Sequence, residues 1–155
     1  MTAPFERARR LLPGLWAGFL LCVAAVATPA AFAVLTTADA GRVAGRILAQ
    51  EATVSLLLGT ALLLLERAAA RRAAAVGQGS QFSNGMVLAL GAVFCTVLGY
   101  FAVQTQLPAA RLGQGALTFG QLHAVSALFF GVKGLLVLAL AWRAAAPAIS
   151  PAVSS

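Results

Sequence analysis

The chain has 155 residues, of which 61% are apolar and 10% are charged, and its formal net charge is +7. This composition excludes an ordinary soluble globular domain, and the length allows one compact bundle but no second domain. The basic residues are divided among short segments without interleaved aromatic residues, so the positive charge does not indicate nucleic-acid binding. Abundant alanine, and arginine in place of lysine, indicate a GC-rich bacterial source.

Four apolar stretches are long enough to cross a bilayer, which needs about 20 apolar residues in a helix. They predict an all-α polytopic membrane protein, with four transmembrane helices in an up-down bundle over residues 11–143. Residues 1–10 are predicted to be a charged leader, and residues 144–155, with prolines and serines, a disordered tail. The four spans are residues 11–35, 47–65, 85–103 and 121–142.

The arginines predict how the bundle is oriented. Seven flank one end of the spans and three flank the other, so the positive-inside rule places both termini in the cytoplasm and the chain in a bacterial inner membrane. The leader and first span imitate a signal peptide, but the apolar stretch exceeds the usual length of about 7–15 residues, and we expect it to be retained. The seven are Arg7, Arg9, Arg10, Arg67, Arg71, Arg72 and Arg143, and the three are Arg42, Arg46 and Arg111.

The first two spans carry further local signals. Gly14 and Gly18 have the GxxxG spacing that lets another helix approach closely, whereas Pro29 should kink or end the first helix. The second span has a clean apolar core of only residues 52–65, so it must recruit the residues before it to cross about 30 Å of hydrocarbon. We expect residues 38–50 to extend this helix above the membrane.

The sequence also predicts the loops between the spans and the glycines at which the third and fourth spans pack. Residues 68–83 are predicted to be a mobile cytoplasmic loop, and residues 104–120 an outer loop. Gly91 and Gly99 in the third span, and Gly134 in the fourth, are predicted to be helix-packing positions.

The only lysine, Lys133, lies in the middle of the fourth span, about 16 Å from the start of its apolar run. A charge at that depth costs roughly 2.5–3.5 kcal/mol on insertion scales, and the side chain is too deep to reach either surface. It must therefore face other helices, water or a ligand. The helical spacing of His123, Ser126, Phe130 and Lys133 predicts one polar stripe towards the bundle interior.

Glu51 is the only acidic residue within reach of Lys133, and a buried lysine needs a partner or loses its proton. Helix rise places Lys133 about 10 Å deeper than Glu51 and His123, a gap that long side chains can span. We therefore predict a polar core of Glu51, His123 and Lys133. Its hydrogen-bonding neighbours are expected to be Gln50, Ser55 and Ser126.

Several plain alternatives stay open. The pair of Glu51 and Lys133 could be structural and fix helix register, Glu51 could be an interfacial carboxylate, and His123 could be a hydrogen-bonding cap. No catalytic triad, phosphate-binding loop, dinucleotide motif or zinc motif is present, and one histidine excludes bis-histidine haem within one chain.

Two cysteines and two tryptophans also lie in the spans. Cys22 and Cys95 are either soft ligands for copper(I) or small apolar fillers, and we assign no metal site. Trp16 and Trp142 are expected to belong to an aromatic belt at the cytoplasmic interface.

Four short stretches carry a family likeness, in the order LLPGLWAG (residues 11–18), ATPAAF (27–32), AGRVAGR (40–46) and QLHAVS (121–126). Together they resemble the bacterial family called domain of unknown function 4149, which is grouped with the eukaryotic transmembrane-protein-205-like proteins. The resemblance covers about residues 10–143 and implies a four-helix integral membrane protein without an established activity. The eukaryotic relatives are associated with platinum-drug resistance, which implies metal or solute handling. A more distant likeness, to the copper-resistance-D-like and membrane protoporphyrinogen-oxidase group, implies histidine-bound copper or haem.

Residues and resemblance together predict a non-enzymatic membrane protein, its cofactor unknown, that handles a small solute, metal ion or proton through a polar bundle interior. Its partners are the lipid bilayer and either a second copy or other membrane helices. Two alternatives stay open. One is a structural or assembly protein that binds partner helices, and the other is a haem- or copper-linked membrane redox protein, with any haem held across a dimer.

Overall fold

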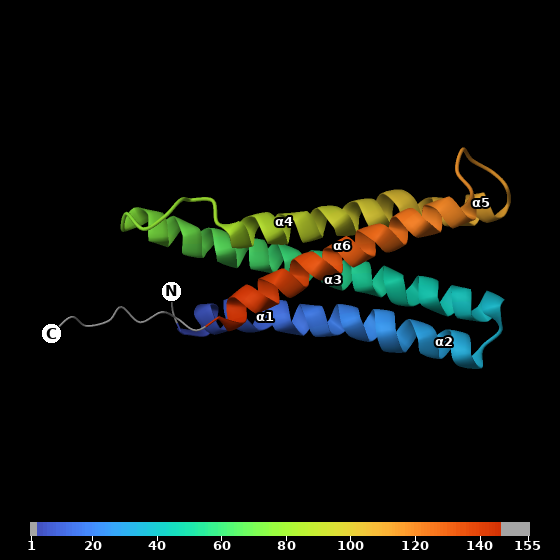
Figure 1. Cartoon of the computed structure of the whole chain (residues 1–155), viewed down its shortest axis with the longest axis horizontal. Helices are drawn as coiled ribbons and strands as arrows, with labels where there is room; N and C mark the ends of the chain where they lie inside the picture. Colours follow the sequence, from blue (N-terminus) through green and yellow to red (C-terminus); the bar gives the residue numbers. More distant parts are fainter. Residues whose placement is uncertain (1–2, 147–155) are drawn as a thin grey trace.

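The computed structural model describes residues 3–146, and helices are their only regular secondary structure (Figure 1). Four helical segments are each long and apolar enough to cross a membrane, which confirms the all-α, multi-span prediction. Successive segments run in opposite directions, and the chain enters and leaves the bundle at the same end (Figure 1). The orientation of that end stays a prediction. The segments are Ala3–Val34, Thr37–Ala75, Asn84–Arg111 and Phe119–Ala145.

Two of the four segments contain π-helical turns, and the other two are single α-helices. The first segment consists of α1 (Ala3–Cys22), the π-helix η1 (Val23–Ala27) and α2 (Thr28–Val34). The third consists of α4 (Asn84–Thr96), the π-helix η2 (Val97–Val103), the 3-10 turn η3 (Gln104–Gln106) and α5 (Leu107–Arg111). The uninterrupted helices are α3 (Thr37–Ala75) and α6 (Phe119–Ala145).

The first helical segment begins earlier than the sequence predicts, and it ends at Val34, close to the predicted end of the span. Residues 3–10, expected as a leader, already form the first turns of α1. Pro29 does not end the helix, because the preceding π-helical turn re-pairs the backbone: the N–H of Thr28 donates to the carbonyl of Val23, five residues back. A proline is also tolerated near the start of the new helical stretch, where its missing N–H costs least.

Residues 38–50 are helical, as predicted, and belong to α3, whereas their place above the membrane stays a prediction. The prediction of a loop over residues 68–83 is wrong in its first half. Residues 68–75 continue α3, because this alanine and arginine stretch is a strong helix former. The helix ends at Ala75, and Gly77 follows with φ 72° and a hydrogen bond from its N–H to the carbonyl of Ala74, the usual left-handed conformation after a helix.

The expected outer loop over residues 104–120 is also shorter than predicted. Residues 104–111 extend the third segment, and the same kind of glycine cap, at Gly113 with φ 71°, closes it. The last helix then begins two residues before the predicted span, because Thr118 and Gln121 form a reciprocal capping box. Of the predicted tail over residues 144–155, residues 144 and 145 are helical, and residues 147–155 lie outside the described part.

The last helix, α6, packs against both α1 and α4. In Figure 1, α6 runs obliquely, from the side of α4 and α5 at one end to the side of α1 at the other. The core near this second end includes Trp16, Leu62 and Val137, each with no exposed surface, and small alanines that let the helices approach. Trp16 is therefore not an aromatic-belt residue, whereas Trp142 is 84% exposed.

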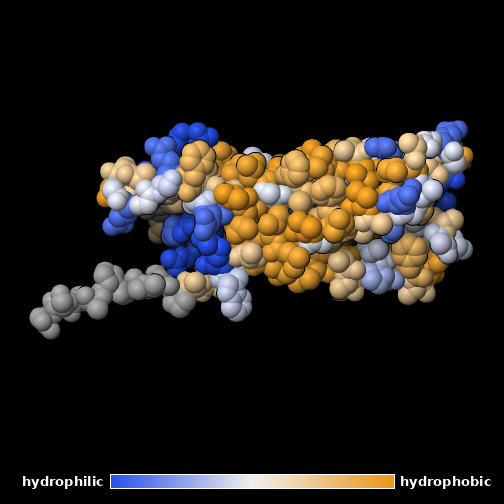
Figure 2. Space-filling model, turned by 45° about the horizontal axis from the view of Figure 1, so that its top comes forward, coloured by the Kyte–Doolittle hydropathy of each residue, from blue (hydrophilic) through white to orange (hydrophobic). Residues whose placement is uncertain are grey.

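The outer surface is apolar along the middle of the bundle and hydrophilic at both ends, as Figure 2 shows. Large side chains on this band are exposed on all four segments, for example Leu15, Leu57, Leu90 and Leu135. Water solvates such a surface poorly, and hydrocarbon covers it at no cost. The protein is therefore a multi-pass membrane protein whose apolar band contacts lipid.

The glycines predicted to pack between helices divide into two groups. A Cβ atom added at Gly91 would lie 3.1 Å from Leu136, and one at Gly99 would lie 2.7 Å from Phe129, so both are close-packing positions. A Cβ atom at Gly14, Gly18 or Gly134 would meet nothing within 4 Å. None of these three packs closely against another helix within residues 3–146, and Gly14 and Gly18 lie on the exposed face of α1, opposite Trp16. Their packing against a partner helix stays a prediction.

Gly59 is a packing glycine that sequence reasoning missed. A Cβ atom there would lie 2.6 Å from Cγ2 of Val93 and 3.1 Å from the ring of Trp16. Neither neighbour can move easily, since valine is stiff at χ1 and the tryptophan is fully buried. Gly59 thus lets α1 and α4 approach α3 at the same level.

We expect Gly59→Ala to destabilise the bundle by about 1–3 kcal/mol through overpacking. Unfolding by titration with sodium dodecyl sulfate, followed by circular dichroism, measures this loss. Gly131→Ala is the matched control, because Gly131 is exposed in the middle of α6 and its added Cβ atom meets nothing within 4 Å. Equal midpoints for both variants would contradict the close approach at Gly59.

Candidate functional site

Four buried side chains from three helices form a continuous polar chain through the bundle. Lys133 on α6 donates hydrogen bonds from Nζ to both carboxylate oxygens of Glu51 on α3, over 2.7 and 2.9 Å. The hydroxyl of Ser55, one turn further along α3, also donates to Glu51. The indole N–H of Trp16 on α1 donates to Ser55 over 2.9 Å. The predicted pairing of Glu51 with Lys133 is confirmed, and Ser55 is its hydrogen-bonding neighbour.

The ion pair lies deep in the bundle and is almost fully buried. Glu51 is 2% exposed and Lys133 is 3% exposed. Each lies fourteen residues after the first residue of its helix, and both helices begin at the same end, so helix rise puts both about 21 Å in. The expected depth difference of about 10 Å is wrong, because α3 begins at Thr37 and not near residue 47.

Burial makes this geometry energetically demanding. Two charges removed from water lose several kcal/mol of hydration each, and only close pairing with further hydrogen bonds compensates for that loss. Glu51 receives three hydrogen bonds here, two from Lys133 and one from Ser55. The ammonium also lies 4.7 Å from the ring centre of Phe130, a cation–π contact on its own helix.

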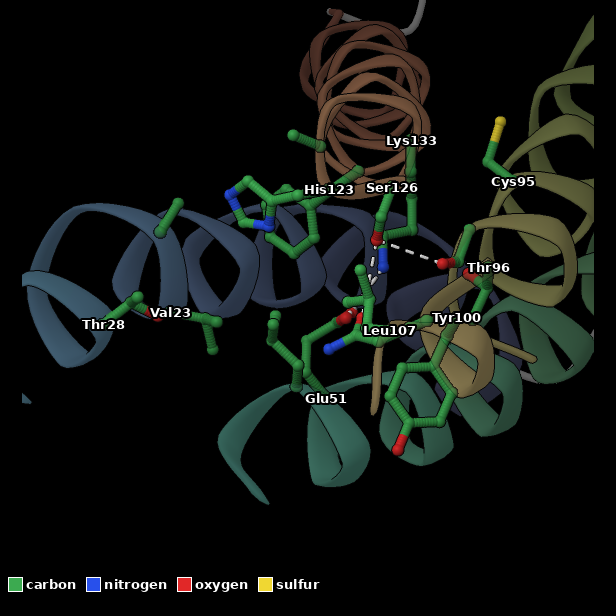
Figure 3. A pocket seen from close by; sticks show the side chains of 16 residues that line it. Val23, Thr28, Glu51, Cys95, Thr96, Tyr100, Leu107, His123, Ser126 and Lys133 are labelled. Carbon is green, nitrogen blue, oxygen red and sulfur yellow. Dashed lines mark hydrogen bonds and ion pairs between the residues drawn. The ribbon is translucent and has the colours of Figure 1, made fainter. Parts of the chain in front are cut away.

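A cavity of about 210 Å³ adjoins the ion pair, and both charged residues line it (Figure 3). Figure 3 shows Lys133 reaching from α6 towards Glu51 on α3. Both π-helical turns contribute to the wall, η1 through Val23 and Ala24 and η2 through Gly99 and Tyr100. The other lining residues are Thr28, Leu48, Cys95, Thr96, Gln104, Leu107, His123, Ser126, Ala127 and Phe130.

The π-helical turns explain how a tightly packed bundle keeps this space. An inserted residue widens the helix locally and redirects the side chains that follow, and such turns occur frequently at functional sites. Gly99 sits in η2, where the hydroxyl of Ser126 donates to its carbonyl over 3.1 Å. The π-helix η2 and the helix α6 therefore approach closely at Gly99, and the cavity lies beside this contact.

The other predicted polar residues have different environments. His123 lines the cavity but is exposed, and its ring stacks on Phe119 with centroids 5.8 Å apart. No hydrogen bond joins His123 to Glu51 or Lys133 within residues 3–146, so the predicted three-residue core is an ion pair with a histidine on the same cavity wall. Gln50 is exposed and lies outside the cavity lining.

The cysteines do not gather with other ligands. Cys95 is buried on the cavity wall, whereas Cys22 is exposed. Among residues 3–146, no three His, Cys, Asp or Glu side chains form a group that could hold a metal ion.

Sequence reasoning missed the role of Trp16 and the involvement of Thr96 and Tyr100. Trp16 occurs in an apolar helix with no neighbouring polar residue, so its inward direction is visible only once the buried face of α1 is known. Thr96 donates to the carbonyl of Ala92 in its own helix, a bond that hides a polar side chain in an apolar span.

An ionic cluster at the opposite end of the bundle was also missed. Arg9 on α1 donates to Glu66 on α3 over 2.9 Å and to Glu6 over 2.6 Å. This cluster ties the beginning of α1 to the second half of α3, and it is partly exposed.

We expect Lys133→Met alone to destabilise the protein by about 3–5 kcal/mol, because it leaves the Glu51 carboxylate buried without its partner. The double variant Glu51→Gln/Lys133→Met should recover most of that loss, since both charges are gone and the volumes are kept. Detergent unfolding of the two single variants and the double variant gives the coupling energy.

An exposed ion pair of the same protein provides the control for this cycle. Arg42 and Asp39 are paired at the beginning of α3, with 74% and 43% of their side-chain surface exposed. Their coupling should not exceed about 1 kcal/mol. A coupling between Glu51 and Lys133 as small as that of this exposed pair would show that the buried contact is not made.

A family model described as "Domain of unknown function (DUF4149)" matches residues 11–116. The matched region is shorter than the expected 10–143. It includes Glu51 and both π-helical turns, and it ends before α6 and Lys133. No curated protein and no solved structure matches the chain.

Proposed function

Because the chain belongs to the DUF4149 family, whose description names no activity, we propose its function from its own side chains: it binds a small solute in the membrane-embedded cavity beside the Glu51–Lys133 ion pair. The observation that carries the proposal is the position of the pair. An ion pair that only fixes helix register needs no space beside it, whereas both members of this pair line a cavity of about 210 Å³.

An organic solute fits the cavity better than a bare metal ion or a proton. The walls are mainly apolar, with Val23, Leu48, Leu107 and Phe130 among them, and apolar walls give binding energy only to a ligand with apolar surface. The polar groups at the pair would then fix its orientation, as in most small-molecule sites.

The proposed location is the inner membrane of a bacterium, with both termini in the cytoplasm. Support comes from the arginines: the end of the bundle where α1 begins and α6 ends carries Arg7, Arg9, Arg10 and Arg143. The positive-inside rule assigns such an end to the cytoplasm. The cavity then lies in the outer half of the bilayer.

Native mass spectrometry of the protein, purified in mild detergent from its own membranes, tests the solute proposal. We expect a reproducible mass addition of one small molecule per chain. Ala127→Trp should remove it, because an indole on the cavity wall occupies the space. Glu51→Gln/Lys133→Met should weaken retention while the fold survives.

The control for the blocking variant is Leu128→Trp, which adds the same side chain at the next residue, 65% exposed and outside the cavity lining. It should retain the bound molecule. If the wild type carries no mass addition, and a metabolite library raises the melting temperature of wild type and Ala127→Trp alike, the cavity is not a binding site.

A second candidate is an assembly protein that binds another helix or a second copy of itself. The observation in its favour is that Gly14 and Gly18 lie on an exposed face of α1, each without a heavy atom within 4 Å of an added Cβ. GxxxG faces of this kind allow close helix pairing in membranes.

If α1 pairs in this way, Gly14→Leu/Gly18→Leu should convert an oligomer into a monomer without lowering the stability of the bundle. Mass photometry in detergent measures the oligomeric state, and Leu15→Ala on the same exposed surface of the helix is the control. An unchanged oligomeric state in both variants would remove this candidate.

A further inference from the structure

The cavity has an opening between two helices that do not pack together. Its lining includes three exposed residues, Ala24 on η1 and His123 and Ala127 on α6. Within residues 3–146, α6 packs extensively against α1 but has no extensive contact with η1 or α2. The oblique path of α6 in Figure 1 therefore separates it from α2 beside the cavity.

This opening lies at the depth of the hydrocarbon. Ala127 is eight residues after the first residue of α6, which puts it about 12 Å into the helix. Exposed apolar side chains lie beside it at the same level, Val26 at 61% and Leu128 at 65% exposure, and Figure 2 shows the apolar band along the middle of the bundle. A molecule dissolved in the bilayer can therefore reach the cavity without crossing water.

The closed end of the cavity is polar but carries no net charge. Lys133 uses two of its three ammonium hydrogens on Glu51, so one N–H has no oxygen acceptor among the described residues. The second carboxylate oxygen of Glu51 accepts only from Lys133 and can accept once more. The end thus offers one donor and one acceptor side by side.

A hydroxyl group matches this arrangement, because it accepts one hydrogen bond and donates another. A carbonyl group can use the donor alone. A charged head group fits poorly, because the pair already neutralises itself and leaves no opposite charge for a buried ligand.

We infer that the ligand is a neutral lipophilic molecule with a hydroxyl or carbonyl group, which enters the cavity sideways from the bilayer between η1–α2 and α6. This inference rests on the proposed solute-binding function and deepens it. The polar group lies at the ion pair, and the apolar part lies against Leu48, Leu107 and Phe130 or extends through the opening into lipid.

Photolabelling in proteoliposomes tests the inference with probes of one chain length. The probes are a diazirine-bearing octanol, the corresponding octanoate and the corresponding octyl-trimethylammonium. The alcohol should label cavity peptides of η2 and α6 at least about tenfold more than either charged probe, because an unpaired charge is excluded from the closed end. Ala127→Trp should abolish this labelling, and Leu128→Trp should preserve it.

Two further comparisons separate this inference from the solute proposal. A water-soluble diazirine-bearing ethanol should label the cavity weakly, since it does not concentrate in the bilayer. Equal labelling by all three octyl probes would overturn the assignment of a neutral head group. Stronger labelling by the ethanol than by the octanol would overturn lateral entry. In either case, a mass addition that Ala127→Trp removes would leave the solute proposal intact, and its absence would remove both.

Discussion

The structure depends on one buried ion pair, between Glu51 and Lys133. A lone ammonium or a lone carboxylate at this depth in an apolar bundle is strongly unfavourable, so each residue requires the other. The contact sets the register of α6 against α3, because a shift of one residue along either helix turns the side chain away by about 100°. Hydrogen bonds from Trp16 to Ser55 and from Ser55 to Glu51 connect α1 to the ion pair. The polar side chains of α1, α3 and α6 are therefore joined in one hydrogen-bonded chain.

The helices diverge on one side of the ion pair and pack tightly on the other. Towards the end where α1 begins, Trp16, Leu62 and Val137 pack between the helices with no exposed surface. Towards the other end, both π-helical turns widen their helices and α6 leaves the side of α2. The ion pair therefore sits at the boundary between a closed core and an open cavity, where its stabilising role and a binding role are compatible.

The sequence predicted the features that follow from the length and periodicity of its apolar stretches. It did not predict which face of an almost uniformly apolar helix packs against the other helices. Apolar length revealed the four spans, and the isolation of Lys133 in its span left Glu51 as its only possible partner. The inward side of α1 was not predictable, because nearly every residue of that helix is apolar and no face stands out. For this reason the sequence did not show that Trp16 faces the core, nor that Gly14 and Gly18 lie on the exposed face of α1. The continuation of α3 past residue 68 was missed because glycine and charge nearby outweighed the helix propensity of its alanines.

The neutrality of the pair connects its structural role to the selectivity that we propose for the cavity. A single unpaired lysine would attract anions, and a single unpaired glutamate would attract cations, but each alone would destabilise the bundle. Because the two charges compensate each other, the bundle remains stable when the cavity is empty, and the site retains directional hydrogen-bonding capacity without a net field for ions. Under the proposed function, insertion energetics and ligand discrimination follow from the same contact: the pairing that stabilises Lys133 in an apolar span also leaves no net charge that would favour an ionic ligand.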